Sequence, residues 1–375
     1  MFMKHYITKI AILSAGLGLS LAKAAPFMAV GDNAELFLTG AATLQADDNI
    51  YLDANNEKSD TIYSFTPGVD LVFGKGSATT GDAYFRDEIR RYSSNSNQDT
   101  TLVAVGAKSN YDNGVTKAGF NAAYTELAQN DNDIRATGTI VHRNLTNIAA
   151  NLEFSFSEKT SLGTGISFDR TDYGPATYSD SNIWSLPVDV YFKASPKLDW
   201  SVGYRYRSSQ LSGAGIDSTD NFLNLGARGE FSPKLTGQVR FGYTRRSLDV
   251  GGDENLFGVD GNLSYAFSEK TVYSFNFGND FGSSGTGDST KNFSIGLNAS
   301  NKMSEQWSFT GGLSYRKIDY STRSDDYLEG LLSVTYSLNS MVNFGASYTY
   351  RNNTSSLSSA EFTNSVFSLG ANVRY

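Results

Sequence analysis

The sequence predicts an all-β protein, a transmembrane antiparallel up-and-down β-barrel of about eighteen strands. Three observations lead to this fold class. The chain begins with an export-type segment, its second half repeats a short turn at a nearly constant spacing, and its last residues alternate apolar and polar side chains as far as the final Tyr375. Strands that alternate over about ten residues and are separated by turns are typical of outer-membrane barrels.

The N-terminal segment resembles a secretory signal. Lys4 and Lys9 flank the start of an apolar run from Ile10 to Leu21, and the small residues of Ala22-Lys23-Ala24 provide a cleavage site. The twelve residues of the apolar run are too few for a membrane-spanning helix, which needs roughly 20. We therefore expect residues 1–24 to be a cleaved signal peptide and residues 25–375 to form a single barrel domain.

The repeated turns have the form FSEKT, SPKL or a close variant. They align on Ser157, Ser195, Ser232, Ser268, Ser304 and Asn339, at spacings of 35 to 38 residues. Longer polar stretches lie between them, for example TDYGPATYSDSN and SSQLSGAGIDSTD. One hairpin and one loop fill each period, so we expect short turns at one end of the barrel and longer loops at the other.

Eighteen alternating segments can be placed between residues 34 and 375, among them one over 134–156. Sixteen strands remain an alternative, because the first third of the chain is less regular. Residues 200–207 show the two faces: one carries Trp200, Val202, Tyr204 and Tyr206, and the other carries Ser201, Gly203, Arg205 and Arg207. A half-buried soluble sheet also alternates, but the export segment and the aromatic end favour a barrel in a membrane.

The final strand carries its apolar side chains on one face. These residues are Phe367, Leu369, Val373 and Tyr375. A closed barrel must pair its last strand with its first, whereas the ends of soluble domains usually fray. We expect this strand to close the barrel.

Composition excludes several classes of function. Removing the three lysines of residues 1–24 takes the formal net charge from −8 to −11, which argues against a nucleic-acid partner. The chain has no cysteine, and His142 is the one histidine beyond residue 24, so neither a metal site nor a catalytic base is evident. We expect no enzyme activity, no metal and no cofactor.

Charged residues gather on the predicted lumen face of the middle strands. Arg205, Arg207, Arg228 and Arg240 come from three consecutive strands, and carboxylates from neighbouring strands share that face. An inward wall of arginines predicts weak anion preference, unless the carboxylates neutralise it by pairing. The carboxylates that we expect to line the pore with these arginines are Asp189, Glu230, Asp260 and Asp280.

Short motifs near the N-terminus resemble the beta-barrel porin-2 family of bacterial outer-membrane proteins. They are Asp48-Asn49-Ile50-Tyr51, Ser59-Asp60-Thr61-Ile62-Tyr63 and Pro67-Gly68. The later SEKT and SPKL turns and the aromatic terminus are also similar, so the resemblance spans nearly the whole chain after residue 24. It implies an outer-membrane barrel with a transport role, sometimes linked to polysaccharide export, and it supplies no catalytic residues.

Two functions follow as expectations. The first is a porin-like channel for passive passage of small hydrophilic solutes, or for export of a polysaccharide. The alternative is a structural or surface-interaction barrel with a blocked lumen. Either one would be located in the bacterial outer membrane, with its lipids and the barrel-assembly machinery as partners.

Overall fold

The computed structural model describes residues 25–134 and 138–375, and all the large elements among them are β-strands. Within these residues no helix is long and apolar enough to cross a membrane. Two 3-10 turns occur, at Ser96–Gln98 and Ser358–Ala360. The strands are β1 (Met28–Val30), β2 (Ala34–Asp47), β3 (Asp60–Phe73), β4 (Thr79–Tyr92), β5 (Thr100–Asp112), β6 (Thr116–Ala128), β7 (His142–Ser155), β8 (Thr160–Tyr173), β9 (Ser181–Ser195), β10 (Leu198–Leu211), β11 (Ser218–Ser232), β12 (Leu235–Leu248), β13 (Gly252–Ala266), β14 (Thr271–Ser283), β15 (Ser289–Lys302), β16 (Trp307–Asp319), β17 (Ser324–Ser337), β18 (Val342–Ser355) and β19 (Phe362–Arg374).

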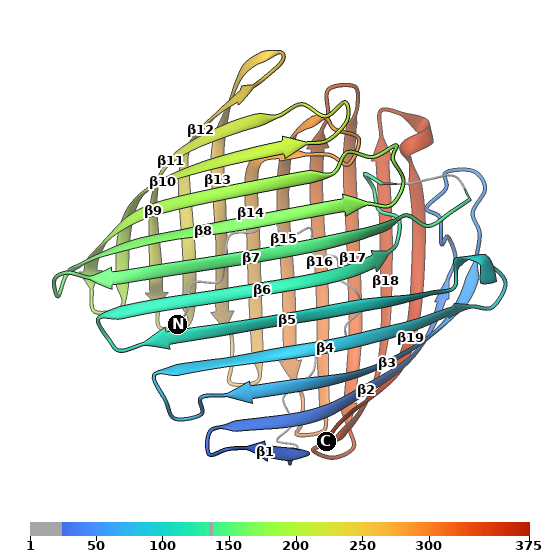
Figure 1. Ribbon diagram of the computed structural model, residues 1–375, viewed down its shortest axis with the longest axis horizontal. Helices are drawn as coiled ribbons and strands as arrows, with labels where there is room; N and C mark the ends of the chain where they lie inside the picture. Colours follow the sequence, from blue (N-terminus) through green and yellow to red (C-terminus); the bar gives the residue numbers. More distant parts are fainter. Residues whose placement is uncertain (1–24, 135–137) are drawn as a thin grey trace.

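Strands β2 to β19 form one closed antiparallel barrel (Figure 1). Each strand pairs with the next in sequence, and β19 pairs with β2 from Val366–Asp47 to Arg374–Thr39. Tyr375 extends this contact, because its N–H donates to the oxygen of Leu38 at 2.9 Å and its own oxygen accepts from Leu38 at 2.6 Å. The barrel therefore has eighteen strands rather than sixteen, and the prediction of a closed up-and-down barrel is confirmed. The short strand β1 lies outside this count and pairs with the start of β2.

The repeated serine or asparagine closes each short turn. In the turn between β7 and β8, Ser157 Oγ accepts the N–H groups of Lys159 at 3.2 Å and Thr160 at 3.0 Å. Ser195, Ser232, Ser268, Ser304 and Asn339 accept backbone N–H groups in the same way. A side chain that bonds the backbone two or three residues later stabilises a tight turn. The spacing of the repeat is thus the spacing of these turns, which lie at the end where β2 begins and β19 ends. We call it the turn end.

The opposite end, which we call the loop end, is less uniform than the polar stretches suggest. The connection from β12 to β13 has only residues 249–251, and that from β16 to β17 only 320–323, because the strands run on through the polar residues. The expectation of uniformly longer loops at this end is therefore wrong at these two hairpins. Long connections remain between β2 and β3 and between β6 and β7.

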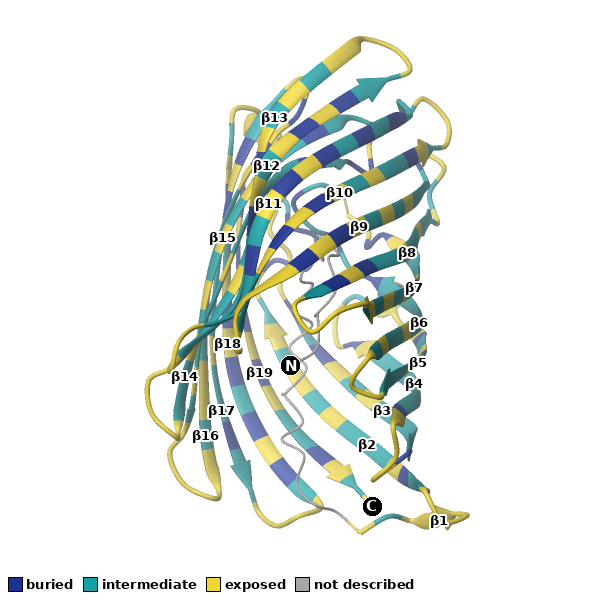
Figure 2. Cartoon of the chain, turned by 90° about the vertical axis from the view of Figure 1, so that its left-hand side faces the viewer, coloured by how far each residue is buried: buried dark blue, intermediate teal, exposed yellow. Residues whose placement is uncertain are grey.

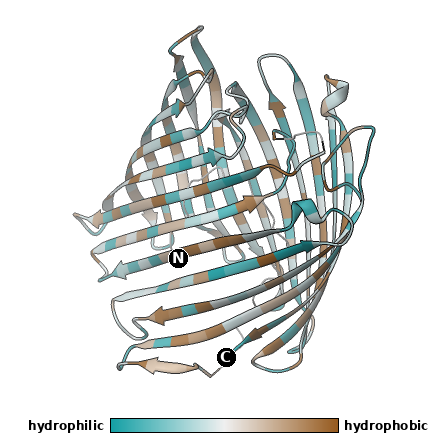
Figure 3. Cartoon of the chain, turned by 45° about the vertical axis from the view of Figure 1, so that its right-hand side comes forward, coloured by the Kyte–Doolittle hydropathy of each residue, from teal (hydrophilic) through white to brown (hydrophobic). Residues whose placement is uncertain are grey.

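The outer face of the barrel is apolar and the inner face is polar. Along the strands, residues of different exposure alternate (Figure 2), and so do apolar and polar residues (Figure 3). On β10, the side chains of Trp200 and Val202 are exposed outward, whereas Ser201 is buried. Exposed Phe, Leu, Val and Tyr side chains recur on every second residue along the wall. So large an exposed apolar surface is stable only against lipid.

This assignment of faces predicts the effect of a charge at neighbouring positions on β15. Leu297 is about half exposed and faces outward, whereas the next residue, Asn298, faces the lumen. Leu297→Arg should destabilise the inserted barrel by roughly 2–4 kcal/mol, and the matched Asn298→Arg by much less. Folding into vesicles at graded urea concentrations measures both, and equal losses would contradict the assignment.

Two segments of the loop end fold into the barrel instead of extending from it. The strand expected over 134–156 begins only at His142, and segments 129–134 and 138–141 pack inside the wall. Val141 is completely buried, and Ile134 is 2% exposed. From these segments, Ile140 joins residues of the β2–β3 loop and of the wall in an apolar cluster of Ile50, Tyr51, Ile62, Tyr92, Leu102, Ala128 and Ile140. The prediction of a strand is wrong for residues 134 and 138–141, because apolar side chains there pack inside the lumen mouth; residues 135–137 lie outside the described residues.

Candidate functional site

The predicted pore-lining arginines all contact carboxylates on the inner wall. Arg205 lies 2.7 Å from Asp280, and Arg207 lies 3.0 Å from the same Asp280 and 2.5 Å from Asp220. Each of these side chains is at most 18% exposed. The two arginines of β10 therefore share carboxylates with β11 and β14.

The remaining two arginines form a second group nearer the turn end. Arg228 lies 2.6 Å from Glu153 and 3.1 Å from Asp199. Arg240 lies 3.1 Å from Asp260 and 3.6 Å from Asp189. Seven of the eight predicted residues thus belong to one wall of ion pairs. The eighth, Glu230, lies beside the turn and bonds Lys197 at 2.7 Å.

Some of these pairs join strands that are not neighbours. Arg205 is on β10 and Asp280 on β14, and Arg228 is on β11 and Glu153 on β7. Strands four apart are separated by about 19 Å along a sheet, at roughly 4.8 Å per strand. Two side chains cannot cover that distance along a flat wall, so the sheet must curve sharply around this wall. The ion pairs fix that curvature.

Aromatic rings support the arginines from beneath. The guanidinium of Arg228 lies 3.3 Å from the ring centre of Tyr191, and that of Arg205 lies 5.0 Å from the ring centre of Phe222. Tyr191 and Phe222 are buried on the inner wall. Contacts between a guanidinium and an aromatic face add attraction and restrict the rotation of the side chain. The charged groups are therefore held in place rather than mobile in the lumen.

Four members of the wall were missed by the sequence prediction. Arg246 and Asp220 follow the same alternation as Arg240 and Arg228, so that signal could have identified them. Arg246 is 1% exposed and bonds both oxygens of Asp220, at 2.6 and 2.8 Å. Glu153 and Asp199 contact Arg228, but Glu153 lies 75 residues away in sequence, and alternation alone does not reveal such a pair.

The wall is nearly neutral overall. It contains five arginines and six carboxylates, because Arg246, Glu153, Asp199 and Asp220 join the predicted residues, with Glu230 set apart at the turn. Ion pairs that satisfy each other leave little net field for a passing ion. The pairing that would neutralise the arginine wall is thus present, which removes the reason to expect anion preference.

The wall formed by β17, β18 and β19 is different near the turn end. Its inward side chains there are mostly hydroxyls and amides, with glycines between them; the exceptions are Arg374 and the apolar pair Leu331 and Val366, which flank Thr349. Asn372 donates to Asn343 at 3.0 Å across two of these strands. The inward hydroxyl, amide and glycine residues are Ser333, Thr335, Asn343, Gly345, Ser347, Thr349, Ser368, Gly370 and Asn372.

The lumen mouth at the loop end is narrowed by the segments that fold inward. Asn130 connects two of them, since its amide donates at 3.0 Å to the backbone oxygens of Tyr51 and Thr139. Leu52 packs with Tyr327 of β17 and Phe362 of β19, on the wall that adjoins β2. Asp131 lies 2.8 Å from Arg143, which is 3% exposed. Apolar packing and buried polar bonds together fix these segments inside the mouth.

Asp133 connects the inward segment 129–134 to two other loops. One of its oxygens accepts the N–H of Gly285 at 2.6 Å, and the other lies 3.8 Å from Arg323. Burial and the nearby Asp131 raise the pKa of Asp133 to about 6, against the opposing effect of Gly285 and Arg323. The charged and titratable groups around it are Asp131, Arg143, Tyr173, Tyr320 and Arg323.

This raised pKa predicts how acid affects the mouth. The buried Asp133 binds its proton more tightly than a solvated carboxyl does. The inward position of segment 129–134 therefore becomes more stable as the pH falls through about 6, and less stable as the pH rises. Because segment 129–134 narrows the lumen mouth, the ion conductance of the barrel should be lower near pH 5 than near pH 7.5. Asp133→Asn should remove this dependence, and Asp131→Asn should weaken it. Recordings across the two pH values check the prediction, and an unchanged pH response in Asp133→Asn would contradict it.

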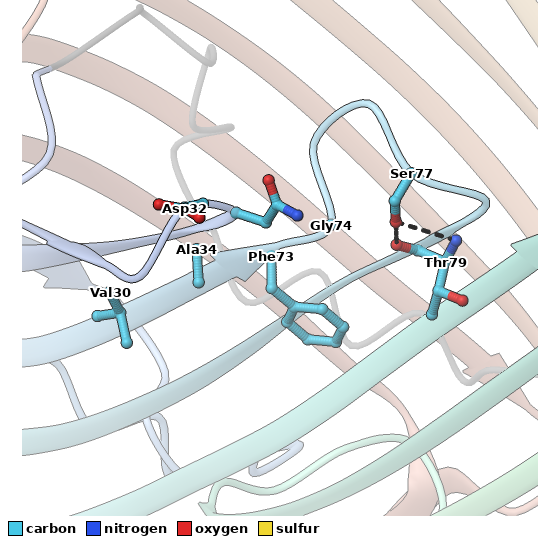
Figure 4. Close-up of a pocket in the computed structure, with 8 residues that line it drawn as sticks. Val30, Asp32, Ala34, Phe73, Gly74, Ser77 and Thr79 are labelled. Atoms are coloured by element: carbon cyan, nitrogen blue, oxygen red, sulfur yellow. Dashed lines mark hydrogen bonds between the residues drawn. The ribbon is translucent and has the colours of Figure 1, made fainter.

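A pocket of about 540 Å³ lies at the turn end, away from the ion pairs. Val30, Asp32, Phe73 and Thr79 are among the residues that line it (Figure 4). Ser77 and Thr79 bond each other beside it, as in the other turns of the chain. The pocket is therefore a space between two hairpin turns, and its lining offers no set of catalytic groups.

Comparisons with solved structures find barrels of similar length. Three crystal structures are OccAB2 of Acinetobacter baumannii, OccK2 (OpdF) of Pseudomonas aeruginosa in complex with glucuronate, and OpdK of Pseudomonas aeruginosa with vanillate. OccAB2 is 10% identical, with 92% of this chain and 98% of that chain covered and a TM-score of 0.48. OccK2 is 10% identical, with 91% of this chain and 98% of that chain covered and a TM-score of 0.49. OpdK is 12% identical, with 92% of this chain and 99% of that chain covered and a TM-score of 0.48.

No curated protein matches the chain significantly. A family model does match, and its description is "Putative beta-barrel porin 2". The match covers residues 25–375, which contain all eighteen barrel strands, the inner wall and the inward segments. The chain therefore belongs to the beta-barrel porin 2 family of porin-like barrels.

Proposed function

We propose that this protein is a channel of the bacterial outer membrane through which small hydrophilic solutes diffuse passively. The observation that carries the proposal is the polar inner face of a closed barrel whose outer face is apolar. Small barrels fill their interior with side chains, whereas an eighteen-stranded barrel leaves room for a water-filled path. Neither the described contacts nor the family supplies a reaction, so we propose transport without catalysis.

The mouth favours small solutes over a polymer. Segments 129–134 and 138–141 and the loop between β2 and β3 occupy its interior, held by the Asn130 bonds and by the apolar cluster. A polysaccharide chain would need this space along its whole length during export. A small solute needs only a narrow path beside the inward segments.

The inner surface favours uncharged solutes. The ion pairs of the charged wall leave nearly no net charge, and strands β17 to β19 present mainly hydroxyls and amides near the turn end. Such groups both donate and accept hydrogen bonds, which suits polyhydroxylated molecules. We propose that the Arg228 and Arg240 pairs shape the path and set its weak ion preference.

The outer-membrane location rests on the exposed apolar face and the export-type N-terminus. Residues 1–24 lie outside the described residues, and we propose that they are a signal peptide removed on export, which leaves residues 25–375 as one domain. Insertion would then require the barrel-assembly machinery and outer-membrane lipid as partners.

A second candidate function is a structural barrel with a blocked lumen. The inward segments and the ion pairs between strands four apart are the observations that favour it, because both reduce the free cross-section. This barrel would act through its loop end and would conduct no ions.

Single-channel recording separates the two functions. Refolded residues 25–375 should give stepwise conductance in a planar bilayer, with a reversal potential near zero across a salt gradient. Heat-modifiable gel mobility shows first that the barrel has folded. Folded barrels that give no conductance steps would overturn the channel function and support the blocked barrel.

A paired substitution tests the role of the charged wall in that channel. Arg228→Gln with Arg240→Gln leaves Glu153, Asp199, Asp189 and Asp260 without their arginines, so the reversal potential should shift toward cation preference. The control is Arg245→Gln with Lys317→Gln, which removes the same charge from the outward faces of β12 and β16. A shift of the same size in both variants would exclude a role for the inner wall.

A further inference from the structure

The barrel wall has an unpaired seam between β13 and β14. Their ladder stops at the pair Val259–Asn279, although β13 continues to Gly252 and β14 continues to Ser283. Over the same residues β13 stays paired with β12, and β14 stays paired with β15. The two hairpins therefore separate at the loop end, and the β12–β13 hairpin projects beyond its neighbours (Figure 1 and Figure 2).

The end of the β14–β15 hairpin folds inside the wall. Phe281 continues the outward alternation of Tyr273 and Phe277, yet it is only 2% exposed. The guanidinium of Arg246, an inward residue of β12, lies 4.7 Å from its ring centre. Lys291 of β15, opposite Phe281 in the ladder, lies 3.2 Å from Glu254 of β13. The outer face of one hairpin thus packs on the inner face of the other.

Side chains replace the missing ladder bonds along the seam. The N–H of Phe281 donates to Asp280 at 2.9 Å, and its oxygen accepts from Arg207 at 2.8 Å. Arg246 donates to the oxygen of Gly282 at 2.6 Å. On the other edge, the amide of Asn279 donates to the oxygen of Phe257 at 2.7 Å. Each of these bonds comes from a side chain and not from the backbone of a neighbouring strand.

The tip of the folded hairpin, residues 284–288, closes over the mouth. Gly285 bonds Asp133 through its N–H, and its oxygen accepts the N–H of Ser179 at 2.8 Å. Gly287 accepts the N–H of Ile216 at 3.2 Å. The tip therefore bridges three other loops: those between β6 and β7, β8 and β9, and β10 and β11.

The free edge of β13 has the length and register to accept the folded segment. Continuing the register from the Val259–Asn279 pair places Phe257 opposite Phe281 and Asn255 opposite Ser283. In that position the side chain of Phe281 would lie on the outer face beside Phe257, a residue that is 62% exposed. Aromatic side chains on the outer face are favourable at the lipid boundary. Backbone bonds would replace the side-chain bonds at Phe281, so both positions satisfy its polar groups.

We propose that residues 280–291 form a flap that moves between these two positions. In the inward position, which the structure holds, Arg207 and Arg246 retain the flap and its tip narrows the mouth. In the outward position residues 280–286 pair with residues 252–258, and the tip leaves the mouth, so that only the inward segments and the β2–β3 loop narrow it. This gating rests on the proposed channel function, whereas the movement itself can be measured without it.

Disulfides in this cysteine-free chain test both positions. Ile134→Cys with Gly285→Cys locks the inward position, because a Cβ at Gly285 would lie 2.9 Å from the Ile134 side chain. Asn255→Cys with Ser283→Cys can form only when the seam is paired. The control pair, Ser264→Cys with Ser274→Cys, joins the two strands where they are already paired. Cross-linking is followed by mass spectrometry in folded barrels, and conductance is recorded before and after reduction.

All three pairs should cross-link. The inward lock should lower conductance at least several-fold, the outward lock should raise it, and the control should leave it unchanged, with reduction reversing each effect. An outward pair that never forms, although each single cysteine reacts with a soluble thiol reagent, overturns the flap. Equal conductance of both locked forms overturns gating by the flap. If every pair forms and no form conducts, the movement is supported and the channel function fails.

Discussion

A chain that ends at Val366 should fail to form a folded barrel. Residues 367–375 supply nearly all of the ladder between β19 and β2, from Phe367–Ala46 to Arg374–Thr39, together with the two Tyr375–Leu38 bonds. Without them, the edges of β2 and β18 would leave backbone groups unpaired in hydrocarbon, at a cost of several kcal/mol for each group. No side-chain contact in the described residues compensates for a loss of that size.

The measurement is the heat-modifiable gel shift of the truncated chain after refolding in vesicles, together with its yield in outer-membrane fractions. Tyr375→Phe serves as the control, because it keeps the backbone bonds and the ring. Recovery of a folded, heat-modifiable species from the truncated chain would show that β19 is not required for closure.

Asp220→Asn should produce the largest loss of stability among single substitutions on the inner wall. Asp220 is completely buried and accepts from two arginines, at 2.5 Å from Arg207 and at 2.6 and 2.8 Å from Arg246. Neutralising it leaves the buried Arg246 without a carboxylate, and it leaves Arg207 with Asp280 alone, which Arg205 also contacts. Removing one member of a buried ion pair costs about 3–5 kcal/mol.

The neighbouring strand pair offers a matched control for this prediction. Arg245, next to Arg246, faces outward and pairs with Asp253, and both are more than 40% exposed. Asp253→Asn removes the same charge, and an exposed pair contributes only about 0–1 kcal/mol. Urea unfolding of the two variants in the same vesicles should differ by several kcal/mol. Similar midpoints would mean that the inner wall is solvated and contributes little.

The strands and turns of the barrel wall could be predicted from the sequence, but the segments that pack inside the lumen could not. Turn positions followed from Ser157 and its equivalents, because a side chain that caps a tight turn is a local signal. The alternation of apolar and polar residues then placed Arg205 and Arg240 on the inner face. Local periodicity does not encode what fills the lumen, so Ile140 and Val141, which pack inside the mouth, were assigned to a strand.

The partners of the arginine–carboxylate ion pairs on the inner wall could not be predicted from the sequence either. Which carboxylate meets Arg228 depends on how sharply the sheet curves, and its partner Glu153 lies four strands away. Phe281 illustrates a second limit. Its alternation predicts an outward side chain, and it is buried because the register between β13 and β14 ends two residues earlier.

The apolar cluster inside the mouth bears on the order in which the barrel forms. All of its members lie between Ile50 and Ile140, so it needs only the strands from β2 to β6 and their connections. Contacts between residues close in sequence form faster than distant ones, since less chain entropy is lost in closing a short loop. The cluster can therefore assemble while the later strands are still unfolded. Strands β2 to β6 would then already be curved around the apolar cluster before the barrel closes. Strands β7 to β19 would add to them in sequence.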